Sequence, residues 1–282
     1  MTVLAAALGL LMGLVVGALG GGGGVLTVPL LVYVLGLTAQ SATTSSIIIV
    51  GITALVGTLA RLRGDRIDWR TGLTFGALGI PAAFLGTLLN RHVDQRVLLL
   101  AFAAVTVLTA IAMLVNSRSG RRKPEESAGE PFPSARPDGS VSTAVRLPVR
   151  VPTRRRRLLV TATKIVLSGL VVGFMTGFLG VGGGFLVVPA LVIILRMPMS
   201  HAVGTSLLII TLNAVSSMAS RVGAPLDLDW RIVVPFTLLS VVGSFLGKRV
   251  ADKLSGDTLT RSFAVMLILV GGFVAVQALG VF

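Results

Sequence analysis

The stretch GLVVGFMTGFLGVGGGFLVVPALV (residues 169–192) repeats an earlier one, GLLMGLVVGALGGGGGVLTVPLLV (residues 9–32), at a constant offset of 160 residues. In both copies an apolar segment is interrupted at the same place by a cluster of glycines and then continues through a Val-Pro pair. A repeat of this kind predicts two related halves that share a centre. We therefore expect any functional site to involve both copies.

The composition places the chain in a membrane. Of its 282 residues, 54% are hydrophobic and 13% are charged, and the mean hydropathy is +0.92. A single soluble core of this length could not bury so much apolar surface. Segments of about 20 apolar residues, long enough to cross a bilayer, lie at 40–60, 70–90, 97–116, 201–220, 231–251 and 259–281. Shorter apolar pairs, 3–19 with 25–36 and 161–179 with 185–196, flank the glycine clusters.

The repeat continues beyond the glycines. Asp68-Trp69 matches Asp229-Trp230, with the offset now 161 residues. Each copy thus holds a short pair of segments broken by glycine, followed by three long ones. We predict an all-α polytopic membrane protein with a first transmembrane repeat at 1–116, a basic linker at 117–160 and a second transmembrane repeat at 161–282.

Positive charge predicts the orientation of the chain. Residues 116–163 carry eleven Lys or Arg against four acids and are rich in Pro, Ser and Gly, so we expect a disordered cytoplasmic linker lying on anionic lipid. Loops 61–70 and 247–261 carry four cations each, whereas loops 90–96 and 221–231 carry two each. Because cations favour the cytoplasmic side, this bias predicts two inverted repeats. No aromatic platform accompanies the charge, which argues against a nucleic-acid partner.

The glycine clusters are the first candidate site. Each glycine destabilises a helix by about 1 kcal/mol relative to alanine, so we expect both apolar segments to break there. A break exposes backbone N–H groups that suit an anion which has lost part of its water. The alternative is close helix packing through small residues, which is the better interpretation of Gly9, Gly13, Gly17 and their copies. The candidate binding glycines are Gly22, Gly23, Gly24, Gly182, Gly183 and Gly184.

Hydroxyl side chains at the start of the next segment are the second candidate site. They stand at matched positions in the two halves and could donate to an oxygen of a substrate. The alternative is a hydrogen bond to the backbone one turn earlier, which is the commonest arrangement of a serine in a membrane helix. The candidates are Thr44, Ser45 and Ser46 in the first half, Gly204, Thr205 and Ser206 in the second, and Asn213 within the same segment as the latter.

Several kinds of chemistry find no support. The chain has no cysteine and two histidines, and no Asp, Glu or Lys lies at the centre of a predicted span, so we expect no metal, no cofactor and no intramembrane carboxylate relay. Scattered acids give no catalytic set, and we expect no enzyme. Arg61 stands at a segment end, where its side chain would reach outward to the interface; attraction of an anion is the alternative. Trp69 and Trp230 are expected interfacial anchors.

These motifs resemble one family of membrane permeases. Gly180-Val181-Gly182-Gly183-Gly184 with Val188-Pro189, followed by Ala202-Val203-Gly204-Thr205-Ser206 and then Asp229-Trp230, is similar to the sulfite exporter TauE/SafE family. The resemblance covers both repeats. It implies movement of small anions, often sulfur oxyanions or organosulfonates. The first copy departs from the pattern, with five glycines at 20–24 and Ala42-Thr43-Thr44-Ser45 in place of the Ala-x-Gly-Thr form.

We therefore predict a transporter of the inner or plasma membrane that moves a small anion, such as sulfite, by alternating access. The site would lie where the two glycine breaks meet the hydroxyl-bearing segments. The expected partners are the anion, the bilayer and a possible second copy of the chain. A passive anion channel shares all of these features, and a membrane-embedded enzyme or non-transporting partner subunit is the remaining alternative.

Overall fold

A computed structural model describes residues 2–21, 23–64, 67–90, 93–120, 154–179, 184–219 and 228–278. Within these ranges every regular element is a helix, and eight of the helices are long and apolar enough to cross a membrane. The prediction of an all-α polytopic membrane protein is confirmed. Most of the basic linker, residues 121–153, lies outside the described residues.

The helices follow the repeat in the sequence. The first half comprises α1 (Thr2–Leu19), α2 (Gly23–Pro29), the π-helical turn η1 (Leu30–Val34), α3 (Ala39–Leu59), the short 3₁₀ turn η2 (Leu62–Gly64), α4 (Trp69–Asn90) and α5 (Gln95–Gly120). The second half comprises α6 (Arg154–Leu179), α7 (Gly184–Ile193), α8 (Met199–Ala219), α9 (Trp230–Lys253) and α10 (Gly256–Ala278).

Two helix ends extend into the segment that the sequence assigned to the linker. Helix α5 continues to Gly120, and α6 begins at Arg154, within the run of four arginines. Arginine is a good helix former, so a run of them can lengthen a helix beyond its apolar part.

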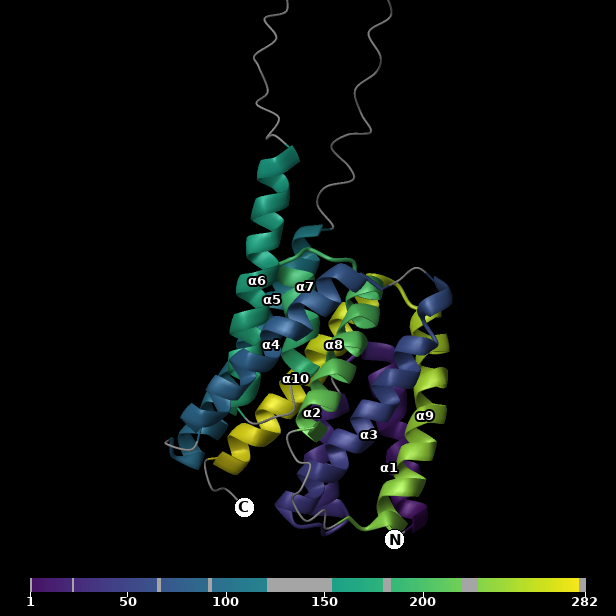
Figure 1. Ribbon diagram of the computed structural model, residues 1–282. Helices are drawn as coiled ribbons and strands as arrows, with labels where there is room; N and C mark the ends of the chain where they lie inside the picture. The colour runs from purple at the N-terminus through teal and green to yellow at the C-terminus, as the bar shows by residue number, and fades with distance from the viewer. Residues whose placement is uncertain are drawn as a thin grey trace, which may run out of the picture.

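Equivalent helices make equivalent contacts across the two halves. Helix α1 packs along α9, and its counterpart α6 packs along α4, while α3 contacts α8, α5 contacts α10 and α2 contacts α7. Figure 1 shows α1 starting and α10 ending at one end of the bundle, whereas α5 ends and α6 starts at the other, which we call the linker end. Helices α1 and α6 therefore run in opposite directions in the bundle, and so do α5 and α10; the inverted repeat as a whole stays a prediction. The orientation of the repeats in a bilayer stays a prediction.

Glycine stripes bring two of these pairs into backbone contact. A Cβ built on Gly13 would lie 2.0 Å from the carbonyl oxygen of Ser240, on α9. In the other half a Cβ on Gly173 would lie 2.4 Å from the carbonyl oxygen of Gly79, on α4. No side chain fits at these distances, so α1 and α6 each need glycine on the face that meets the partner helix. The packing interpretation of the glycine stripe is confirmed.

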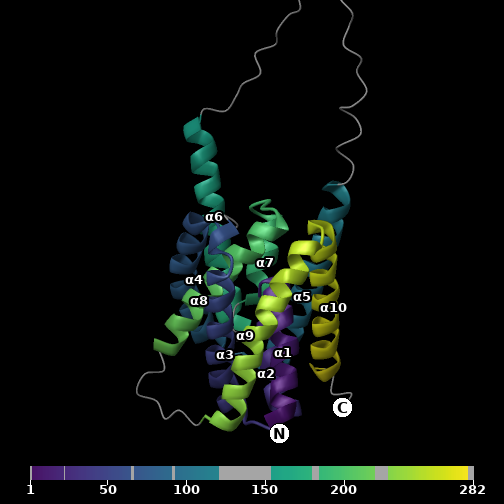
Figure 2. The same ribbon diagram turned by 90° about the vertical axis from the view of Figure 1, so that its right-hand side faces the viewer.

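The two short helices lie in different parts of the bundle. In both views α2 lies in the lower half, and α7 lies in the upper half, near the linker end (Figures 1 and 2). The segment Gly184–Val192 of α7 is entirely buried, and it joins the buried first half of α8 in the largest apolar core. The equivalent α2 alternates between buried and partly exposed residues from Gly23 to Val28, and Tyr33 and Val34 of η1 are exposed. The core is therefore denser around α7 than around α2.

The Asp-Trp pairs mark the starts of α4 and α9. The Asp68 carboxylate accepts hydrogen bonds from the Thr71 N–H (3.1 Å) and the Thr71 hydroxyl (2.7 Å). The Asp229 carboxylate accepts from the Arg231 N–H at 3.0 Å. Both aspartates thus satisfy backbone donors of a first helical turn. The indoles of Trp69 and Trp230 are exposed, as an interfacial anchor requires.

Candidate functional site

Helix α1 ends at its glycine cluster, as the sequence predicts, whereas residues 180–183 of the second cluster lie outside the described residues. Helix α1 ends at Leu19 and α2 begins at Gly23, while α6 ends at Leu179 and α7 begins at Gly184. Gly20 has a φ of 77°, in the left-handed region that favours glycine. Of the candidate glycines, Gly22, Gly182 and Gly183 lie outside the described residues.

The two breaks meet each other. A Cβ on Gly21 would lie 2.6 Å from the carbonyl oxygen of Gly184, and a Cβ on Gly184 would lie 2.9 Å from the carbonyl oxygen of Gly21. The same two Cβ atoms would each lie 3.0 Å from Cδ1 of Ile210 on α8. The two halves therefore touch backbone to backbone where both helices break. We call Gly20, Gly21 and Gly184 the glycine junction.

Two other candidate glycines face neighbouring helices instead. A Cβ on Gly23 would lie 2.3 Å from Cγ2 of Val16, so this glycine packs on α1. A Cβ on Gly24 would meet Val50 at 3.6 Å, an ordinary contact. The structure thus gives Gly24 room for a small side chain.

The second-half hydroxyls bind the first half. The fully buried Ser206 hydroxyl donates to the carbonyl oxygen of Gly20 at 2.8 Å and lies 2.9 Å from that of Val203. The fully buried Thr205 hydroxyl accepts from the Asp68 N–H at 3.1 Å. Gly204, between Val203 and Thr205, is buried as well. Helix α8 therefore holds both the glycine junction and the start of α4.

The first-half hydroxyls are arranged differently. Thr44 donates to the Gln40 carbonyl oxygen at 3.1 Å, and Ser46 donates to the Thr43 carbonyl oxygen at 2.9 Å, so both form the local backbone bonds that were the alternative interpretation. Ser45, the counterpart of Thr205, is fully buried, and its hydroxyl has no hydrogen-bond partner among the described residues.

Ser244 and Asn213 are two further polar residues of the second half. The Ser244 hydroxyl on α9 is also buried without a partner in the described part of the chain. Asn213 is partly buried and lies two turns beyond Ser206 on the same face of α8, about 10 Å along the helix axis. It also lies one turn beyond Ile210, which meets the glycine junction, so a part for Asn213 in the site stays a prediction.

Arg61 does not reach outward, and that expectation was wrong. Its side chain is only 5% exposed, and its guanidinium donates to the carbonyl oxygens of Gly57 (3.3 Å) and Gly17. The end of α3 supplies unpaired carbonyl groups and the negative end of a helix dipole, which favour a cation there. Close packing of α1 on α9 at Gly17 brings a further carbonyl within reach. Arg61 thus ties the end of α3 to α1.

Sequence reasoning missed Gly20, Gly21 and Ile210 as contact residues. The first two belong to the glycine run that the sequence singled out, so their position could have been anticipated. Ile210 carries no such signal, because an isoleucine in an apolar segment is unremarkable. Within the described ranges no three His, Cys, Asp or Glu side chains gather closely enough to hold a metal ion.

Comparison with known proteins agrees with the family resemblance of the sequence. The model of the sulfite exporter TauE/SafE family matches residues 5–274. A probable membrane transporter protein of Xylella fastidiosa (strain Temecula1) is 30% identical over 268 residues, covering 94% of this chain and 91% of that protein. The probable membrane transporter protein YunE of Bacillus subtilis (strain 168) is 25% identical, with 94% and 93% covered. No solved structure matches. The chain therefore belongs to the sulfite exporter TauE/SafE family of membrane transporters.

Proposed function

We propose that the protein carries a small anion, a sulfur oxyanion or organosulfonate such as sulfite, across the cell membrane by alternating access. The observation that supports this most is the contact between Gly21 and Gly184. A broken helix from each half ends there, so a binding site between the breaks would be reached by both halves. The proposal involves transport only, with no chemical change of the anion.

Neutral donors would hold the anion. Ser45 is a buried hydroxyl without a partner in the described chain, and a buried polar group in that condition costs free energy unless something else binds it. A substrate oxygen would supply the missing partner. Backbone N–H groups at the two breaks would add further donors, because the first N–H groups of a helix have no partner within it.

Movement of the halves would open the site. In the described conformation the glycine junction is close-packed, since even one added Cβ would lie within 3 Å of the opposing backbone. The surroundings are unequal, because Gly184–Val192 of α7 is buried whereas the equivalent α2 and η1 are partly exposed. In the alternate conformation α2 and η1 would become buried and α7 partly exposed. That exchange would open the opposite end of the bundle. This inequality supports alternating access over a fixed pore.

The orientation follows from charge. Helices α3 and α9 end toward the linker end of the bundle (Figures 1 and 2), and Arg61, Lys248 and Lys253 lie at or close to these helix ends in the sequence. Cation-rich ends of membrane helices stay in the cytoplasm. We propose that the linker end faces the cytoplasm and that the linker lies on anionic lipid there.

Flux in proteoliposomes tests the proposal. We would load vesicles with sulfite, thiosulfate, sulfonates, sulfate or chloride and follow uptake of labelled anion with and without gradients of pH or voltage. A carrier shows saturable uptake that is accelerated by the same anion on the opposite side. A channel shows flux that rises without saturation and has no such acceleration. No flux of any anion under any gradient would remove the proposal.

Ser45→Ala refines the test. The loss of one donor to an anion is expected to raise KM about tenfold, as a charge-assisted hydrogen bond is worth about 1.5–3 kcal/mol, while the protein stays folded. Thr44→Val is the matched control, because the Thr44 hydroxyl already donates to the backbone. Equal KM values for Ser45→Ala and the unmodified protein would remove Ser45 from the site.

A further inference from the structure

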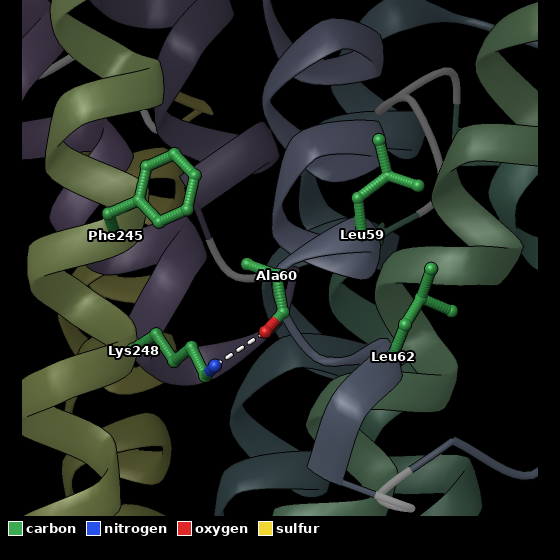
Figure 3. A pocket seen from close by; sticks show the side chains of 5 residues that line it. All are labelled: Leu59, Ala60, Leu62, Phe245 and Lys248. Atoms are coloured by element: carbon green, nitrogen blue, oxygen red, sulfur yellow. Dashed lines mark hydrogen bonds between the residues drawn. The ribbon is translucent and has the colours of Figure 1, made fainter.

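A groove opens between α3 and α9 at the linker end of the bundle. It has a volume of about 610 Å³ and is lined by Leu59, Ala60, Leu62, Phe245 and Lys248. Figure 3 shows Phe245 and Lys248 on one side of the groove and the three other residues on the opposite side. We call these five residues the α3–α9 groove. Its walls come from different halves of the protein.

The walls of the groove are apolar and exposed. Leu59 is 54% exposed, Leu62 45% and Phe245 47%. Leu59 and Leu62 line one side of the groove and Phe245 lines the other, so together they give it a strip of hydrocarbon rather than isolated side chains. An exposed apolar strip of this kind suits an acyl chain.

One cation stands at the edge of the strip. The Lys248 ammonium donates to the Ala60 carbonyl oxygen at 2.5 Å, which satisfies the last turn of α3. An ammonium has three N–H donors, so the bond to Ala60 engages one of them. Arg249 is the next residue and is exposed. The groove therefore combines a hydrocarbon wall with a cation that is held in place.

We propose that the α3–α9 groove binds one anionic phospholipid, with its phosphate on Lys248 and an acyl chain along Leu59, Leu62 and Phe245. The two chemistries of the groove point to this occupant together. A small free oxyanion would gain nothing from the apolar walls, and a neutral lipid would gain little from the cation. The end of the bundle adds charge complementarity, because basic residues near a membrane surface attract anionic headgroups.

A lipid in this position would bridge the two halves. One wall belongs to α3 and η2 and the other to α9, and α3 is already tied to α1 through Arg61. Any rocking of the halves would change the width of the groove. The effect on transport rests on the proposed function, whereas lipid binding itself does not.

Native mass spectrometry of the purified full chain tests the binding. Phosphatidylglycerol and phosphatidylcholine are added separately to the protein in detergent, and the retained lipid is counted. Unmodified protein is expected to retain phosphatidylglycerol in preference. Lys248→Gln should lower that retention roughly fivefold, because one basic residue at an anionic surface is worth about 1 kcal/mol. Lys253→Gln, an exposed lysine of the same helix outside the groove, should leave it unchanged.

Other outcomes separate the alternatives. Equal retention by Lys248→Gln and unmodified protein would overturn the proposal, and so would equal retention of both lipids. Displacement of phosphatidylglycerol by millimolar inorganic phosphate would assign the site to a small oxyanion instead. If Lys248→Gln fails to fold, Phe245→Ser is the second variant. It keeps the lysine but removes an apolar side chain that lines the groove, and it should also lower the retention of phosphatidylglycerol. Loss of lipid with normal anion flux would leave the proposed function intact.

Discussion

The matched pair Thr205 and Ser45 offers a direct measurement of what each buried hydroxyl does. Thr205→Val keeps the shape of the side chain but removes the acceptor for the Asp68 N–H, which now bonds at 3.1 Å. An unsatisfied backbone donor at a buried contact costs about 1–2 kcal/mol. For a chain of this size that corresponds to a fall in Tm of roughly 2–8 °C. Thr205→Ser keeps the hydroxyl and should recover most of the loss.

Ser45→Ala is the control. The Ser45 hydroxyl has no partner among the described residues, so its removal should leave Tm unchanged or raise it slightly. The assay is thermal unfolding in detergent, followed by tryptophan fluorescence, because Trp69 is adjacent to Asp68. A Tm within 1 °C of the unmodified protein for Thr205→Val, or an equal loss in Ser45→Ala, would refute the reasoning.

Four further substitutions should change Tm in the same assay. Gly177→Ala places a Cβ 1.8 Å from a carbonyl oxygen of α4 and should destabilise the protein by about 1–3 kcal/mol; Gly272→Ala meets nothing within 4 Å and should stabilise it by up to about 1 kcal/mol. An unchanged Tm in both would contradict the packing account. Asp68→Ala removes the acceptor for the Thr71 N–H and should lower the free energy of unfolding by about 1 kcal/mol. An unchanged Tm would show that Asp68 does not stabilise the start of α4. Arg196→Gly relieves a φ of 52° and should raise stability by about 1 kcal/mol, whereas a lower Tm would show that the arginine side chain matters more than its backbone.

The repeat made much of the fold predictable. Glycine at matched positions indicated both the helix breaks and the stripes on α1 and α6, because backbone contact and helix interruption each demand glycine. The sequence could not show that α1 pairs with α9 and α6 with α4. A repeat reveals which segments are equivalent, but partner choice depends on contacts between segments far apart in the chain.

The polar contacts of the site were less accessible to sequence reasoning. Ser206 bonds Gly20 across 186 residues of sequence, and Arg61 bonds Gly17 across 44. The local pattern around Arg61 indicated only a charged residue after an apolar segment. Its burial involves the Gly17 carbonyl oxygen of α1, a residue outside that local pattern. Local residue patterns therefore predicted the candidate hydroxyls but not which of them already had partners.

The proposed alternating access requires the two glycine breaks to be free to separate and meet during transport. Gly184→Ala and Gly24→Ala test it most directly in the flux assay, because both lie in a candidate glycine cluster. The added Cβ would lie 2.9 Å from the Gly21 carbonyl oxygen in the first variant but 3.6 Å from Val50 in the second. We predict that folded Gly184→Ala loses anion flux while Gly24→Ala keeps it. Flux through Gly184→Ala at the rate of the unmodified protein would contradict the account.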